Sequence, residues 1–87
     1  PPLPSLSGRE VVRVFESFGW EVARQRGSHI VLVKDGSLAT LSVPDHRPLA
    51  KGTLRSLIRS ADLTVSEFVT ATEELSGIGP FGPPISL

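Results

Sequence analysis

The sequence predicts an α+β domain in which two amphipathic helices cover one face of a three-stranded antiparallel sheet. Three observations lead to this prediction. A helical stripe of apolar residues lies near the N-terminus, short strands joined by tight turns fill the middle, and a second helical stripe follows them. Because each stripe needs a sheet face to cover it, the result is a two-layer sandwich. A length of 87 residues suits one domain.

The first helix is expected over residues 8–18, after an extended lead-in rich in proline. Ser7 and Glu10 have the spacing of a capping box, in which each side chain satisfies a free backbone N–H group of the other residue. Apolar side chains then recur with helical spacing at Val11, Val14, Phe15 and Phe18. Gly19 supplies the stop, since glycine readily adopts the left-handed conformation in which many helices end.

Three strands are expected over residues 20–26, 29–34 and 38–43. Only Gly27 and Ser28 separate the first two strands, and Asp35-Gly36 is a hairpin signal before the third. Connections this short join antiparallel neighbours. Pro44 is expected to end the third strand, because proline cannot donate a ladder hydrogen bond.

The second helix carries an apolar stripe at Leu54, Leu57, Ile58 and Ala61. A second capping box, from Thr64 to Glu67, opens a short third helix that contains Phe68 and Val69. We expect a domain over residues 1–75 and a flexible Gly/Pro-rich tail over residues 76–87. The order α-β-β-β-α, with a short extra C-terminal helix, is that of a double-stranded-RNA-binding domain.

The composition excludes several classes of site. The absence of cysteine excludes disulfides, thiolate metal sites and thiol nucleophiles. Two histidines without a close carboxylate cluster do not suggest a metal site, so we expect neither metal nor cofactor. No apolar run approaches the ~20 residues of a membrane span, and no secretory signal pattern opens the sequence. We therefore expect a cytoplasmic protein without a membrane partner.

The net charge is zero, yet the cations are concentrated in the middle of the chain. Residues 24–59 hold seven Lys/Arg and two acidic residues, whereas residues 63–87 hold three glutamates and no Lys/Arg. The second helix carries a cation at every fourth residue, at Lys51, Arg55 and Arg59, so these side chains line one of its faces. A local basic zone on a neutral chain indicates a polyanion partner.

The stretch RQRGSHIVLV, residues 24–33, offers the clearest candidate for chemistry. His29 is the first residue of an expected apolar strand and directly follows Gly27 and Ser28. The unperturbed pKa of histidine, about 6.5, suits proton transfer near neutral pH. RNA carries its own nucleophile, the 2′-hydroxyl. A general acid or base at His29 can therefore trigger RNA cleavage without a metal.

Neighbouring residues suit the binding of an RNA backbone. Gly27 has no Cβ and allows close approach, and the Ser28 hydroxyl can donate to a phosphate oxygen. Two pairs of cations can hold the phosphates electrostatically: Arg24 with Arg26, and Lys51 with Arg55. There is also an interpretation without function. In it, Gly27 and Ser28 only form a turn, His29 is an ordinary surface residue, and the cations of the second helix only face solvent. Composition and spacing alone favour this interpretation.

His46 is a possible second site residue, and two interpretations of it remain open. A pair of histidines can act as base and acid on the two oxygens of one phosphodiester, provided that His46 lies near the same phosphate as His29. Alternatively, His46 caps or packs the loop before the second helix. The sequence favours the second interpretation.

Five short motifs stand in one order along the chain: Gly19-Trp20, Gly27-Ser28-His29, Val43-Pro44-Asp45-His46, residues 52–57 and residues 61–68. In this order and spacing, over residues 6–69, they resemble the HicA toxin family of mRNA interferases from toxin–antitoxin modules. The resemblance implies a fold like the double-stranded-RNA-binding domain, ribosome-independent cleavage of mRNA that inhibits translation, and neutralisation by a HicB-like antitoxin. It also implies that His29 is catalytic and that Gly27 is functionally sensitive.

The chain departs from this family at two positions. Ile30 stands where many members carry a second histidine, which weakens any mechanism with adjacent histidines. Asp62 stands where the family usually has glycine, and aspartate tolerates the left-handed conformation that a helix end can need. Two further functions remain as alternatives: a non-catalytic RNA-binding module of the same fold, and a protein-interaction domain that uses the apolar tail.

Overall fold

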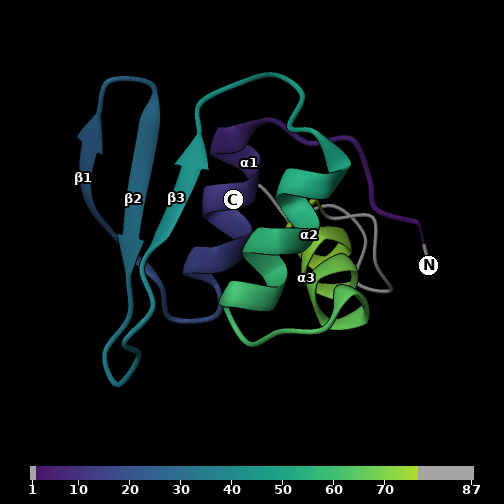
Figure 1. Cartoon of the computed structure of the whole chain (residues 1–87). Helices are drawn as coiled ribbons and strands as arrows, with labels where there is room; N and C mark the ends of the chain where they lie inside the picture. The colour runs from purple at the N-terminus through teal and green to yellow at the C-terminus, as the bar shows by residue number, and fades with distance from the viewer. Residues whose placement is uncertain (1, 77–87) are drawn as a thin grey trace, which may run out of the picture.

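The computed structural model describes residues 2–76, which form three helices on one side of a three-stranded sheet (Figure 1). In chain order the elements are α1 (Gly8–Glu16), β1 (Glu21–Arg26), β2 (His29–Val33), β3 (Leu41–Pro44), α2 (Lys51–Ser60) and α3 (Val65–Ser76). The strands lie in the order β1-β2-β3, and both pairs are antiparallel. The predicted α+β fold is confirmed.

The local signals for the helix starts are confirmed. At α1 the backbone N–H of Ser7 donates to Glu10 Oε1 at 2.8 Å, and the N–H of Glu10 donates to Ser7 Oγ at 3.2 Å. Thr64 and Glu67 form the same reciprocal pair at α3, at 2.8 and 3.0 Å. Asp62 has φ +61°, the left-handed conformation expected of it. Helix α3 runs for 12 residues and is longer than predicted.

Five predicted boundaries were wrong by one to three residues. Strand β2 ends at Val33, one residue before its predicted end, and β3 includes Pro44, which was expected to end it. Helix α1 stops at Glu16 because a tight turn, closed by Gly19 at φ +97°, follows it. Strand β1 begins after Trp20, whose N–H donates to the carbonyl of Phe15 at 3.2 Å and not to the sheet. Strand β3 begins at Leu41. Its predicted first residues form a local bond, from Ala39 N–H to Ser37 Oγ at 3.1 Å, and such bonds compete with a ladder.

The core lies between the helices and one face of the sheet, called the inner face below. Ile30 and Leu32 of β2 and Leu41 and Val43 of β3 are buried there. The helices contribute Val11, Val14 and Phe15 from α1, Leu54, Leu57 and Ile58 from α2, and Phe68 from α3. The rings of Phe15 and Phe68 pack with their centroids 5.3 Å apart, which attaches α3 to α1.

Strand β1 extends the sheet beyond the helix layer. All six of its residues are exposed, and it is paired only with β2. Strand β1 therefore lies at the edge of the sheet that is farthest from α2 and α3 (Figure 1). No helix within residues 2–76 is long and apolar enough to cross a bilayer. The boundary predicted at residue 75 falls inside α3, and the rest of the predicted tail, residues 77–87, lies outside the described residues.

Candidate functional site

The Gly27-Ser28 pair forms the two-residue turn between β1 and β2, and Arg26 and His29 close it as cross-strand partners. Gly27 has φ +58°, which explains the glycine, because a side chain is strained in that conformation. A Cβ at Gly27 would meet no described atom within 4 Å beyond Gly27 itself and its two chain neighbours. The glycine therefore serves the turn geometry, and its surroundings are open to a ligand.

His29 lies on the face of the sheet opposite the helices, called the outer face below. Its neighbour Ile30 is buried on the inner face, and successive side chains of a strand point to opposite faces. His29 is exposed, and its cross-strand partners are Arg26 on β1 and Pro44 on β3.

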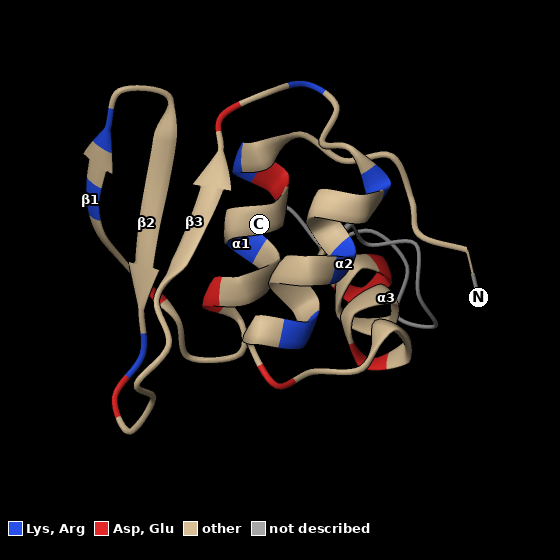
Figure 2. Ribbon diagram, viewed as in Figure 1, with Lys and Arg blue, Asp and Glu red and all other residues tan. Residues whose placement is uncertain are grey.

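Arg24 and Arg26 share the outer face with His29. Arg26 is the direct partner of His29, and Arg24 is the partner of Val31, two residues further along the strand. Direct partners in an antiparallel pair project from the same face. Both arginines are exposed, and Figure 2 shows the cations on β1 at the end near the turn. The structure therefore brings together five predicted site residues, Arg24, Arg26, Gly27, Ser28 and His29.

The segment after β3 passes close to this turn. The N–H of Asp45 donates to the carbonyl of Ser28 at 2.7 Å, and the N–H of Gly8 donates to the carbonyl of His46 at 2.8 Å. The His46 side chain is exposed. The backbone of His46 thus helps to hold the loop before α2, which agrees with the interpretation of His46 as a loop-packing residue. Its imidazole remains accessible to a ligand.

The two predicted cations of α2 lie in the helix layer, apart from the outer face. Lys51 Nζ donates to the carbonyl of Leu3 at 2.6 Å, so this ammonium is engaged with the lead-in segment. Arg55, one turn further along α2, is exposed. The N-cap residue of α2, Ala50, provides no side-chain cap, and the first turn of the helix contains no acidic residue. The start of α2 therefore still favours an anion, but it does not share a surface with His29.

Sequence reasoning did not select the arginines around the start of α1. Arg9 and Arg13 of α1 and Arg47 of the β3–α2 loop line a hollow of about 490 Å³ together with Glu10. Hydrogen bonds from Ser7, backbone first and then hydroxyl, lower the pKa of Glu10, and Arg47 and Arg13 act in the same direction. The signal for these arginines was weak, because Arg9 and Arg13 occupy ordinary exposed helix positions.

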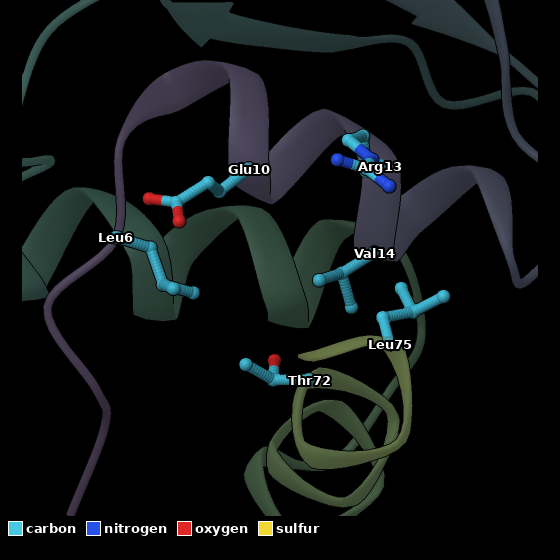
Figure 3. A pocket seen from close by; sticks show the side chains of 6 residues that line it. All are labelled: Leu6, Glu10, Arg13, Val14, Thr72 and Leu75. Carbon is cyan, nitrogen blue, oxygen red and sulfur yellow. The ribbon is translucent and has the colours of Figure 1, made fainter. Parts of the chain in front are cut away.

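A smaller hollow of about 120 Å³ lies between the lead-in, α1 and α3 (Figure 3). Leu6, Val14, Thr72 and Leu75 line it together with the charged Glu10 and Arg13. No histidine lines it, so it lacks a side chain suited to proton transfer at neutral pH. Among residues 2–76, no three His, Asp or Glu side chains gather as metal ligands.

The geometry defines a small α+β domain that presents the exposed His29 with two arginines on the open face of its sheet. Residues 8–63 match the family described as the HicA toxin of bacterial toxin–antitoxin systems, and the chain belongs to this family.

A solved structure described as a toxin–antitoxin complex from Streptococcus pneumoniae contains a similar chain. The two chains are 30% identical with a TM-score of 0.60, and the match covers 67% of this chain and 98% of the other. No curated protein sequence matches the chain. The match to the family covers α1 through the end of α2 and includes the predicted site residues.

Proposed function

We propose that this protein is a metal-independent endoribonuclease that cleaves mRNA, with His29 as a general acid or base. The observation that carries the proposal is the exposure of His29 on the outer face, between Arg26 and Pro44 and at the end of a buried strand. Proton transfer to a bound substrate requires an accessible imidazole that a rigid strand holds in position. Membership of the HicA toxin family supports the proposal.

The proposed reaction uses the 2′-hydroxyl of RNA as the nucleophile. Loss of its proton lets the 2′-oxygen bond to the adjacent phosphorus, and the bond from phosphorus to the 5′-oxygen breaks. The departing 5′-oxygen takes up a proton. The products are a 2′,3′-cyclic phosphate and a 5′-hydroxyl. Arg24 and Arg26, on the same face as His29, would offset the negative charge of the phosphate.

The test is cleavage of RNA in EDTA by the wild type, His29→Ala and a control. Val33→Ala is a matched control, because Val33 lies on the same strand and face as His29 and is 40% exposed. His29→Ala should lower the rate by ~10²–10⁴-fold, the usual contribution of a positioned acid–base group. RNA with a 2′-O-methyl group at the scissile nucleotide should resist cleavage.

Two outcomes would overturn this proposal. Products with a 5′-phosphate would show that water attacks in place of the 2′-hydroxyl. Wild-type protein that binds RNA without cleaving it would leave the non-catalytic RNA-binding module as the function. Unfolding in urea should show nearly equal stability for His29→Ala and the wild type, since an exposed side chain contributes little to the core.

We also propose that a HicB-like antitoxin neutralises this protein by covering the outer face. Family membership and the similarity to a chain from a toxin–antitoxin complex support this partner. A partner seated over His29 would exclude RNA, and acidic groups on it would complement Arg24 and Arg26. Co-purification with the product of a neighbouring gene, followed by a cleavage assay of the complex, tests the proposal. Cleavage by the complex at the full rate would show that occlusion is the wrong mechanism.

A further inference from the structure

The ladder between β2 and β3 continues past the last residue of β3. Pro44 is the cross-strand partner of His29, and the N–H of the next residue, Asp45, donates to the carbonyl of Ser28 at 2.7 Å. The N–H of Gly8, at the start of α1, donates to the carbonyl of His46. The backbone before His46 is therefore held at the Gly27-Ser28 turn, and the carbonyl of His46 is held at the start of α1.

The contacts of Asp45 indicate where the neighbouring side chains point. Its carboxylate forms an ion pair with Arg9 of α1, so this side chain points toward the helix layer. Successive side chains of an extended segment alternate in direction, and the first bend after β3 is at Arg47. His46 is exposed and follows Asp45, so it belongs on the outer face with His29. Diagonal neighbours across an antiparallel pair are about 7–8 Å apart, and this is the spacing expected for His46, which follows the partner of His29, Pro44, by two residues.

The proposed cleavage needs two proton transfers on opposite sides of one phosphorus atom. One group takes the proton of the 2′-hydroxyl, and another supplies a proton to the departing 5′-oxygen. A single imidazole on a rigid strand cannot contact both oxygens in one in-line displacement. Two imidazoles at the separation expected for His29 and His46 can lie on either side of a phosphodiester, each within hydrogen-bond reach of one oxygen.

We infer that His46 is a second catalytic residue, which donates the proton to the 5′-oxygen while His29 takes the proton of the 2′-hydroxyl. This inference rests on the proposed endoribonuclease activity. The bond between the 2′-oxygen and phosphorus forms as the bond between phosphorus and the 5′-oxygen breaks. His29 then holds one more proton and His46 one fewer, and exchange with water restores both side chains.

The test uses an RNA in which sulfur replaces the 5′-oxygen at one mapped cleavage site. A thiol is much more acidic than an alcohol, with a pKa of about 8.5 for cysteine, so the thiolate leaves without a proton donor. The full chain is compared with His29→Ala, His46→Ala and the control Arg47→Ala, an exposed neighbour in the same loop. Urea unfolding of each variant confirms that it is folded.

His46→Ala should cleave ordinary RNA ~10²–10⁴-fold more slowly than the wild type, yet cleave the sulfur-substituted RNA within a few-fold of the wild-type rate. His29→Ala should be slow on both substrates, and Arg47→Ala should affect both substrates equally. Equal losses on both substrates in His46→Ala, or no loss on either, would refute the donor role while leaving His29 and the endoribonuclease activity intact. Wild-type protein that cleaves neither RNA would refute the endoribonuclease itself, and this inference with it.

Discussion

Arg9 of α1 holds the carboxylate of Asp45 through two nitrogens, with Nε 3.3 Å from Oδ1 and Nη2 3.2 Å from Oδ2. The two residues are distant in sequence, and their pairing attaches the segment after β3 to the first turn of α1. Because the N–H of Asp45 also bonds to Ser28, this one residue connects α1, β3 and the turn before His29. The pair therefore fixes the position of the candidate site relative to the helix layer.

The Arg9–Asp45 pair should matter more for cleavage than for stability. The side chain of Arg9 is 73% exposed, so solvent screens the attraction, and such pairs contribute about 0.2–1 kcal/mol. Urea unfolding of Arg9→Ala, Asp45→Ala and the double variant gives the coupling energy. We expect a coupling within that range and a larger proportional loss of RNA cleavage in Asp45→Ala. If cleavage follows stability in all three variants, the pair has no positioning role.

The two predicted cations of α2 should differ in their effects. Arg55→Ala should weaken RNA binding and leave stability unchanged. The slope of log K against log salt concentration should decrease in magnitude by about 0.7–0.9, which corresponds to the loss of one phosphate contact. Lys51→Ala should also cost about 0.5–1.5 kcal/mol of stability, because it removes the hydrogen bond to Leu3.

Binding is measured by titration in the His29→Ala background, so that the RNA remains intact. Ser56→Ala, at an exposed and uncharged neighbour of Arg55 on α2, is the control. An unchanged slope in the double variant of Lys51 and Arg55 would place the phosphate contacts elsewhere.

Three glycines should respond differently to alanine. Gly27→Ala should cost about 1–2 kcal/mol, because φ +58° strains a side chain even in open space. Gly8→Ala should cost more, since its Cβ would collide with the carbonyl oxygen of Pro44 and displace the segment that carries Asp45 and His46. Gly52→Ala is the control. It lies in α2 with open space around it, and should stabilise by about 0.5–1 kcal/mol. Urea unfolding measures all three, and an equal cost for Gly27 and Gly8 would contradict the packing described for α1.

Glu10 should make the stability of the protein depend on acidic pH. Hydrogen bonds from Ser7 lower the pKa of Glu10 below 4.5, so the ionised carboxylate stabilises the folded state. This contribution to stability is complete above pH 4.5, and it is lost as the pH falls through the lower pKa that Glu10 has in the folded protein. Glu10→Gln should therefore be less stable than the wild type at pH 7, and the difference should close in acid. Urea unfolding across this range, with Glu16→Gln as the control, measures it. A difference that does not change with pH would exclude the carboxylate charge as its source.

Elements with local signals could be predicted from the sequence. Each capping box joins residues three positions apart, and the Gly27-Ser28 turn joins adjacent strand ends, so both are encoded within one short segment. The left-handed conformation of Asp62 likewise depends on a helix end and on the residue type. These features fix the order of helices and strands. With the two apolar stripes, that order is sufficient for the α+β fold.

The face that His29 occupies, and the residues around it, depend on long-range packing and could not be predicted from the sequence. Residues 30–33 are all apolar, so the alternation that normally distinguishes the two faces of a strand is absent from the sequence. Packing of Ile30 and Leu32 against the helices places His29 on the outer face. The bonds of Asp45 to Arg9 and Ser28, and of Lys51 to Leu3, join segments far apart in the chain. They form only after the helices dock on the sheet, because no local pattern specifies which distant groups the packed core brings together.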